Sequence, residues 1–395
     1  MPITTVDQPA HAGFDIVTRH RPTSIGMLST YPPTQCGLAT FSAALVEHLR
    51  ALAVSVGVVR VLDGAEPTVG PDVVAHLVNG SADSAVAAVR RLNGFDAVVV
   101  QHEYGIYGGP DGVDVLRIVG ALTVPKIIVL HTVLQDPTDD QREILLRLLA
   151  AADVVVTMTE TAGRRLVASY GADPAQLVVI PHGAVEHRPQ FVGERPPADR
   201  PLVLTWGLLG PGKGIEWAID AMVGLRDLRP RYLVMGRTHP KVAQRDGETY
   251  RDGLVQRAGQ AGVDDIVELD DRYLDTGELA ELVHQADVVL LPYDSREQVT
   301  SGVLIEAIAA GRPVVSTAFP HAIELLADGT GIVVPQRDPA ALEVALRRVL
   351  AEPGLAGGMA AQAARKAPEL LWPAVADRYR TLARGLVAAG LAEAS

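Results

Sequence analysis

Residues 291–317 constrain the fold more than any other stretch, because they predict a strand, a turn, a helix and a second strand in immediate succession. The apolar run that ends at Leu291 is typical of a buried strand in a parallel sheet. After a loop, residues 303–310 have the apolar spacing of a helix, which Gly311 ends, and residues 313–317 form the next strand. Two parallel strands joined by a helix place the chain in the α/β class.

The turn in this segment has the properties of a phosphate-binding site. Ser301 and Gly302 follow the strand and open the helix, so free backbone N–H groups gather at the positive end of the helix dipole. Glu306 lies beyond the first helical turn, where a ribose could donate hydrogen bonds to its carboxylate. The segment therefore predicts a nucleotide-binding α/β protein.

The length of 395 residues predicts two domains, because single hydrophobic cores stop growing at roughly 250–300 residues. Hydrophobic residues make up 48% of the chain and aromatic residues 4%, which suits parallel sheets that are buried on both faces. A net charge of −12 argues against nonspecific binding of nucleic acid, whose affinity comes largely from basic residues. We therefore expect no nucleic-acid partner.

The single cysteine, Cys36, excludes a disulfide within the chain and a cysteine-rich zinc site. It fits a reducing compartment, and we expect a cytoplasmic protein. No uninterrupted apolar run reaches about 18 residues, so no transmembrane helix is expected. Peripheral contact with a membrane surface through an amphipathic helix stays open, as does the oligomeric state.

Composition divides the chain into five segments. Residues 1–23 are polar and form the expected flexible leader, and residues 24–185 form a first domain of alternating strands and helices. Residues 186–200 are charged and proline-rich, which is typical of a linker. Residues 201–370 repeat the strand–helix pattern as a second domain, and residues 371–395 form a long terminal helix.

Several candidate ligand residues directly follow expected strands of the first domain. His102, Glu103 and Tyr104 follow one strand, and His131 follows the next. Open α/β sheets bind ligands at the carboxyl ends of their strands, which favours a functional role, although a lone histidine is more often structural. His182 lies in a later turn, which we expect it to hold by hydrogen bonds.

A glycine-containing turn opens a helix in each domain. Gly37 either permits close approach of a ligand to the backbone or only forms a tight turn. Residues 207–214 combine glycines with Lys213, which suits a phosphate, although an exposed lysine in a tight loop would give the same pattern. Arg237 ends the next strand, where a guanidinium could bind phosphate through two hydrogen bonds.

Taken in this order, the segments resemble the retaining glycosyltransferases of family 4, which have the GT-B fold of two doubly wound, Rossmann-like domains facing across a cleft. The resemblance runs from Ser24 to the C terminus. The family signature has two glutamates separated by seven residues, and the second corresponds to Glu306. Gln298 stands in place of the first, with Glu297 beside it; a glutamine can hydrogen-bond to a sugar hydroxyl but carries no charge. Leu208 stands where the family has an arginine.

The resemblance implies a role for each candidate residue. The catalytic groups at the donor sugar and ribose would be His131, Gln298 and Glu306. The nucleotide-sugar donor would be bound by Gly37, Lys213, Arg237, Ser301, Gly302 and Glu306. The acceptor side would contain His102, Glu103 and Tyr104. The terminal helix would cross back to the first domain, and the backbone of residues 270–274 would contact the base.

We therefore predict a nucleotide-sugar-dependent hexosyltransferase that retains the anomeric configuration and requires no cofactor and no metal ion. GDP-mannose or UDP-glucose is the expected donor, and a hydroxyl group of a sugar, glycan or small molecule is the acceptor. Two alternatives stay open. One is a phosphorylase or epimerase with the same fold, and the other is a non-catalytic nucleotide-sugar-binding protein, which Leu208 and Gln298 would suit.

Overall fold

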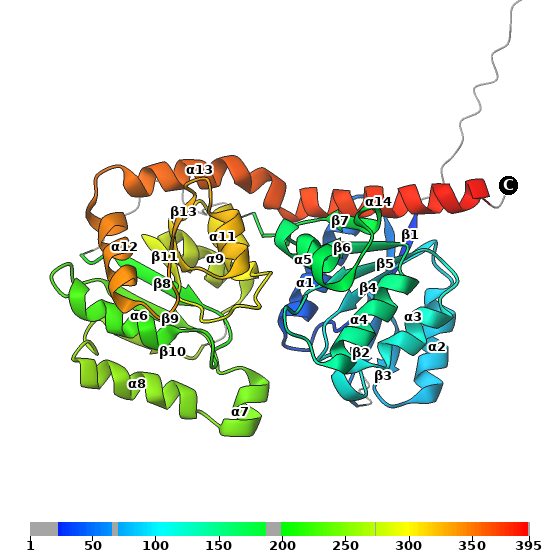
Figure 1. The fold of residues 1–395 in the computed structure, drawn as a ribbon, viewed down its shortest axis with the longest axis horizontal. Coiled ribbons are helices and arrows are strands. Elements are labelled where there is room, and N and C mark those ends of the chain that lie inside the picture. The colour runs from blue at the N-terminus through cyan, green and yellow to red at the C-terminus, as the bar shows by residue number, and fades with distance from the viewer. Residues whose placement is uncertain (1–22, 65–69, 187–198, 273, 394–395) are drawn as a thin grey trace, which may run out of the picture.

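A computed structural model describes residues 23–64, 70–186, 199–272 and 274–393. The chain forms two lobes side by side, each built around one β-sheet (Figure 1). Two hydrophobic clusters belong to each sheet, because helices cover both of its faces. Residues 1–22 of the expected leader and residues 187–198 of the expected linker lie outside the described residues.

The sheet of the first domain has seven parallel strands in the described part of the chain. In spatial order they are β3 (Val73–Val78), β2 (Ser55–Leu62), β1 (Ser24–Ser29), β4 (Ala97–His102), β5 (Lys126–Leu130), β6 (Val154–Thr157) and β7 (Leu177–Val179). The α-helices packed around them are α1 (Gly37–Ala51), α2 (Ala82–Leu92), α3 (Val115–Ala121), α4 (Asp139–Ala151) and α5 (Glu160–Tyr170). The strand order reverses between β1 and β4, and such a reversal opens a crevice at the carboxyl ends of the strands.

The second domain repeats this arrangement with six parallel strands among its described residues. Their spatial order is β10 (Val267–Asp270), β9 (Arg231–Met235), β8 (Leu202–Trp206), β11 (Val288–Leu291), β12 (Val314–Thr317) and β13 (Gly331–Val334). Its helices are α6 (Ile215–Met222), α7 (Pro240–Asp246), α8 (Thr249–Ala261), α9 (Thr276–Gln285), α10 (Gly302–Ala309), α11 (Pro320–Leu325) and α12 (Pro339–Ala351). Here the order reverses between β8 and β11.

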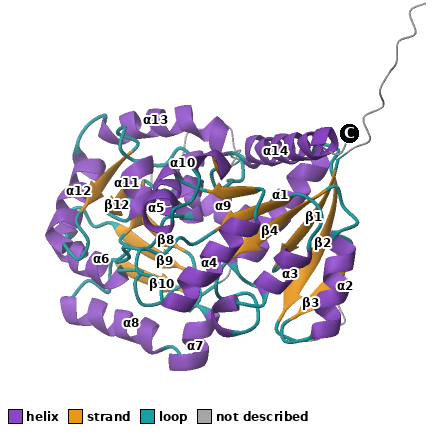
Figure 2. Ribbon diagram, turned by 45° about the vertical axis from the view of Figure 1, so that its right-hand side comes forward, coloured by secondary structure: helices purple, strands orange, loops and turns teal. Residues whose placement is uncertain are grey.

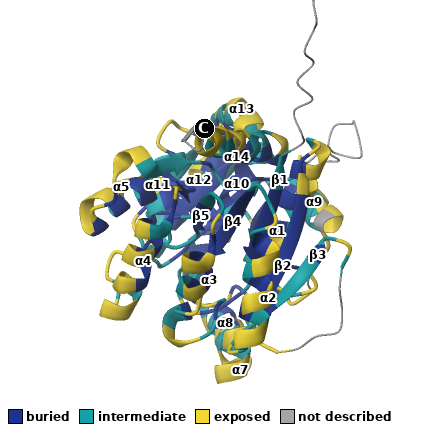
Figure 3. Ribbon diagram, turned by 90° about the vertical axis from the view of Figure 1, so that its right-hand side faces the viewer, coloured by how far each residue is buried: buried dark blue, intermediate teal, exposed yellow. Residues whose placement is uncertain are grey.

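The central strands are almost entirely buried and mostly apolar, as expected for strands with helices on both sides. β4 reads AVVVQH and β11 reads VVLL, and every residue of both strands is buried. Figure 3 shows β1, β2 and β4 in dark blue beneath helices whose outer sides are exposed. Complete burial of a valine or leucine side chain contributes about 1.5–3 kcal/mol, so these strands supply much of the stability.

The last two helices divide between the domains. α13 (Leu355–Leu370) contributes Ala363 and Leu370 to the core of the second domain. α14 (Trp372–Glu393) contributes Trp372 and Tyr379 to the core of the first domain. Figures 1 and 2 show the two helices end to end along one side of both lobes.

The chain crosses between the domains at two segments that touch each other. The Ala184 N–H donates to the Leu370 carbonyl at 2.8 Å, and the Trp372 N–H donates to the Ala184 carbonyl at 3.0 Å. The indole of Trp372 covers Gly183, where a Cβ atom would lie 2.2 Å from the indole Cδ2. A side chain at residue 183 is therefore incompatible with this crossing.

The structure confirms the expected α/β class and the two doubly wound parallel-sheet domains. Helices α3, α7 and α8 were not predicted from the sequence. α3 and α7 have only seven residues each, and α8 buries only Leu254 and Ala258, so their hydrophobic periodicity is weak.

The Gly183→Ala substitution should destabilise the protein by about 1–3 kcal/mol, because the added methyl group overlaps the buried indole of Trp372. Chemical denaturation monitored by circular dichroism measures the loss. Gly120→Ala is the matched control: Gly120 is an exposed residue of α3 with open space around its Cα, so alanine should stabilise by about 0.5–1 kcal/mol. Equal stability of the two variants would contradict the role of Gly183.

Candidate active site

The predicted ligand residues lie at or just beyond the carboxyl ends of strands, and several of them lie where the strand order reverses. In the first domain Gly37 follows β1, and His102 ends β4 with Glu103 and Tyr104 directly after it; in the second domain Lys213 and Gln298 follow β8 and β11. Contacts between the domains show that these loops face one another. The Lys241 Nζ donates to the Gly105 carbonyl at 3.3 Å, and the His182 ring lies against Gly302, where a Cβ atom would be 3.0 Å from Nε2.

Gly37 is the first residue of α1, and a Cβ atom built on it meets nothing within 4 Å. The preceding residue, Cys36, is the N-cap, and its Sγ accepts a hydrogen bond from the Ala39 N–H at 3.4 Å. The start of α1 thus combines the positive end of a helix dipole with open space, which suits an anionic or hydroxylated ligand.

His131 directly follows β5 and is held in a neutral form. Its Nε2 lies 2.7 Å from the Gln101 Oε1, and with the amide in this orientation Nε2 donates the hydrogen bond and Nδ1 is free to accept one. Burial, together with charge repulsion from His182 and His102, lowers the pKa of His131 to about 3. An uncharged imidazole at this position can accept a hydrogen bond from a sugar hydroxyl.

The three residues predicted for the acceptor side are buried to different degrees. His102 and Tyr104 are buried, and their rings meet edge to face with centroids 5.0 Å apart. Burial lowers the pKa of His102 to about 4. Glu103 is partly exposed and accepts hydrogen bonds from the Thr132 hydroxyl at 2.5 Å and the Tyr104 N–H at 3.0 Å, while burial raises the pKa of its carboxyl group. Of the three, Glu103 is the one that an acceptor can reach most directly.

The glycine-rich loop after β8 packs tightly on the end of β11. Gly214 has φ = 64°, and a Cβ atom there would lie 1.9 Å from the Pro292 carbonyl oxygen, so only glycine fits. The loop places the Lys213 Nζ over the Tyr293 ring, 4.4 Å from its centroid. This cation–π contact fixes a positive charge beside the strand ends.

Further basic groups gather around Lys213. Arg237 is exposed at the end of β9, and His239 follows two residues later. Burial and the positive charges of Lys241 and Lys213 lower the pKa of His239. This side of the cleft therefore attracts anions.

The start of α10 is held by two histidines that the sequence did not identify as site residues. The Ser301 hydroxyl caps the helix by accepting from the Leu304 N–H at 3.3 Å, and the Ser301 N–H donates to the His321 Nδ1 at 2.8 Å. His182 lies against Gly302 from the first domain, and its Nδ1 is 2.7 Å from the Gly183 carbonyl, as expected for a residue that holds its turn. Burial lowers the pKa of His182 to about 4 and that of His321 to about 3.

Glu306 lies one turn into α10 and is largely removed from water. The indole N–H of Trp206, at the end of β8, donates to its carboxylate. Burial raises the pKa of Glu306 to about 7, so the group titrates near neutral pH. Glu306 lies beside the reversal between β8 and β11, where an open α/β sheet binds nucleotides, so its carboxylate could bind a ribose hydroxyl.

Gln298 and Glu297 have different surroundings, although they are adjacent. The Glu297 carboxylate binds the first domain, because Oε2 accepts from the Arg165 Nη1 at 2.9 Å and from the Gln135 N–H at 2.7 Å. Glu297 therefore does not supply the charge that the signature glutamate would have. At the position of the first signature glutamate the loop therefore presents the partly buried side chain of Gln298.

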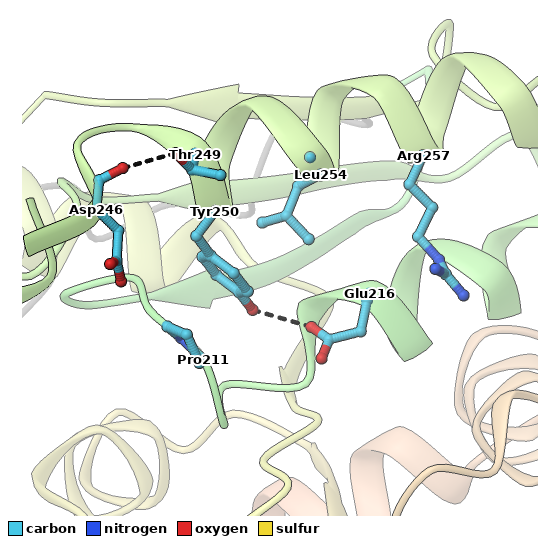
Figure 4. Close-up of a pocket in the computed structure, with 8 residues that line it drawn as sticks. Pro211, Glu216, Asp246, Thr249, Tyr250, Leu254 and Arg257 are labelled. Atoms are coloured by element: carbon cyan, nitrogen blue, oxygen red, sulfur yellow. Dashed lines mark hydrogen bonds between the residues drawn. The ribbon is translucent and has the colours of Figure 1, made fainter.

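A surface pocket of about 410 Å³ lies next to the glycine-rich loop, between α6 and α8 (Figure 4). In this pocket the Tyr250 hydroxyl donates to the Glu216 carboxylate at 2.9 Å, and Pro211 of the loop forms part of the wall. None of the predicted site residues lines it. The pocket is therefore separate from the cleft between the domains.

Two family profiles match the two domains in turn. The profile described as Glycosyltransferase Family 4 matches residues 36–188, and the profile described as Glycosyl transferases group 1 matches residues 200–352. The chain therefore belongs to the group 1 glycosyltransferases. Their GT-B fold, expected from the sequence, is confirmed by solved structures. A glycosyltransferase from Rickettsia africae superposes with a TM-score of 0.74 at 13% identity, covering 93% of this chain and 99% of that one.

Other similar proteins include HepE from Anabaena, solved in complex with UDP and glucose, with a TM-score of 0.72 at 16% identity over 92% of this chain and all of the other. A D-inositol 3-phosphate glycosyltransferase from Kineococcus radiotolerans is 30% identical over 58% of this chain and 57% of its own length. A glycogen synthase from Mycobacterium tuberculosis is 31% identical over 53% of this chain and 48% of its own length. The chain thus aligns with about half the length of these curated relatives. Among the described residues, no helix is both long and apolar enough to span a bilayer.

The titration of Glu306 should make stability depend on pH. Because its folded pKa is raised, the native state holds a proton that the unfolded chain has lost, and stability falls as pH rises from about 4.5 through about 7. From pH 5 to pH 8 the free energy of unfolding of the wild type should fall by about 2 kcal/mol more than that of Glu306→Gln. Urea denaturation of the ligand-free protein measures both values. Glu281→Gln, on the exposed side of α9, is the control and should follow the wild type. If the stability of Glu306→Gln and of the wild type changed equally with pH, the raised pKa of Glu306 would be refuted.

Proposed function

We propose that the protein transfers a hexose from a nucleotide-diphosphate sugar to a hydroxyl acceptor, with retention of the anomeric configuration. The observation that carries the proposal is the arrangement of the strand ends around the cleft. The second domain contributes the basic groups of Lys213 and Arg237, and the first contributes the neutral His131 and the open start of α1. A diphosphate suits the basic side, and a sugar suits the neutral side.

UDP-glucose is the first donor to test, because HepE was solved with UDP-glucose and a related Escherichia coli structure holds UDP-2-fluoro glucose. GDP-mannose, also expected from the sequence, is the second. The acceptor is a hydroxyl of a sugar, glycan or small molecule, and Glu103 is the group proposed to hold it.

The proposed chemistry is mostly electrostatic. Lys213, Arg237 and the first turn of α10 would stabilise the negative charge that grows on the leaving diphosphate. Glu306 would accept hydrogen bonds from the ribose. His131, through Nδ1, and Gln298 would hold hydroxyl groups of the donor sugar, so that the acceptor attacks from the face that the diphosphate leaves. We propose that no cofactor and no metal ion is required.

A non-catalytic nucleotide-sugar-binding protein is the second candidate. It is favoured by one observation: Glu297 is bound to Arg165, so no carboxylate replaces the signature glutamate at Gln298. Product analysis by NMR distinguishes the two, since any release or transfer of hexose from a bound donor excludes the non-catalytic protein. Sugar phosphate formed with inorganic phosphate would indicate a phosphorylase, and an epimerised nucleotide sugar an epimerase.

A donor screen tests the proposal directly. UDP-, GDP-, ADP- and dTDP-sugars are added to the protein without metal and then with Mg²⁺, and thermal stability and hydrolysis are recorded. A ligand at about 100 times its dissociation constant should stabilise the native state by about 2.7 kcal/mol. Failure of every nucleotide to shift the unfolding temperature would overturn the proposed function.

Lys213→Met should weaken binding of the donor about 10- to 100-fold, because a hydrogen bond to a charged group contributes about 1.5–3 kcal/mol. Isothermal titration with the nucleoside diphosphate identified by the screen measures the change. Arg348→Met removes the same charge from the exposed side of α12 and is the control, for which we expect wild-type affinity. Equal affinity of Lys213→Met and the control would remove Lys213 from the donor site.

A further inference from the structure

The loop between β11 and α10 is attached to the first domain on both sides of Gln298. On one side, the Glu297 carboxylate accepts from the Arg165 guanidinium and the Gln135 N–H. On the other side, the Val299 carbonyl accepts from the Thr159 hydroxyl at 3.1 Å. The position of Gln298 therefore depends on residues that belong to the opposite domain.

The Val299 side chain strengthens this attachment. Val299 is 2% exposed and belongs to the hydrophobic cluster of the first domain, together with Tyr104, Val133 and Tyr170. A residue of the second domain is thus part of the core of the first. The loop can take this position only when the two domains are together.

Arg165 connects this loop to the segment that carries His131. Its side chain, on α5, is 10% exposed, and Nη1 donates both to the Glu297 carboxylate and to the Val133 carbonyl at 2.5 Å. Val133 lies two residues after His131, and Gln135 donates to the same carboxylate. One buried guanidinium therefore holds both segments that are proposed to contact the donor sugar.

We propose that Arg165 is a positioning residue that assembles the sugar end of the donor site when the domains close. The Arg165–Glu297 pair and the insertion of Val299 fix Gln298 relative to His131, whereas Glu306, Lys213 and Arg237, proposed to bind the ribose and diphosphate, all lie in the second domain. This inference rests on the proposed function. It assigns the signature loop two roles: Gln298 contacts the sugar, and Glu297 is its anchor.

The structure offers matched controls on the same helix. Arg164, next to Arg165, is 69% exposed and lies 3.8 Å from the Glu324 carboxylate. Glu324 makes a separate contact between the domains by accepting from the N–H groups of Glu160 and Thr161 at 2.9 and 2.7 Å. Arg164→Met therefore controls for the loss of one positive charge on α5. Glu324→Gln controls for weaker contact between the domains at a place remote from Gln298.

The test compares dissociation constants for UDP and UDP-glucose, and the hydrolysis rate of UDP-glucose, in the full-length chain. If the screen identifies another donor, that nucleotide and its sugar conjugate take their place. Arg165→Met should keep the affinity for UDP but lose the extra affinity conferred by glucose, and turnover should fall about 100-fold, as for a reacting group displaced by about 1 Å. Arg165→Lys should recover part of the turnover, and both controls should resemble the wild type.

Each outcome decides a different point. If the wild type binds neither UDP nor any other nucleotide, the proposed function fails. If the wild type binds and hydrolyses the donor and Arg165→Met does so equally well, the function stands and the positioning role is overturned. The role is also overturned if Arg165→Met and Glu324→Gln lose turnover equally. Should Arg165→Met not fold, Glu297→Gln, which keeps the shape of the loop, should show the same selective loss, and wild-type behaviour of that variant would overturn the role.

Discussion

The contact of Trp372 with the turn at Gly183 holds both crossing segments on the first domain, at the point where they leave for the second. Its backbone N–H binds Ala184, and its ring lies close to Phe41 and His182, with centroid distances of 5.0 and 5.7 Å. Phe41 in turn meets the His131 ring edge to face at 4.9 Å. One aromatic group therefore connects the crossing segments, helix α1 and two histidines of the cleft.

The two sides of the cleft differ in charge because their polar groups differ in burial. His131 and His182 of the first domain are neutral at physiological pH, since burial lowers their pKa to about 3 and about 4. The second domain contributes the basic side chains of Lys213 and Arg237. Under the proposed function, the leaving diphosphate would face the basic side and the sugar the neutral side, as in a site whose fixed charges match those that develop during reaction.

Local sequence was enough to predict the fold class and to place the candidate residues on strand ends. Apolar runs followed by polar or glycine-rich turns have only a few arrangements in a parallel sheet, so order alone placed His131 and Lys213 after strands and Glu306 on the next helix, while the family resemblance supplied their roles. What the sequence did not reveal are the contacts between distant residues. Arg165 and Glu297 are separated by 132 residues, and nothing in the local pattern distinguishes Arg165 from the exposed Arg164 beside it. The neutral state of the histidines could not be predicted from the sequence either, because it depends on how the chain packs around them.

The burial of Val299 in the core of the other domain has a thermodynamic consequence. Separating the domains would expose this side chain and the apolar surface around it to water, much as a local unfolding step does. Closure therefore releases hydration water and lowers the heat capacity, and its driving force weakens on cooling. A cleft that is held partly by an apolar side chain opens more readily in the cold than one that is held by ion pairs alone.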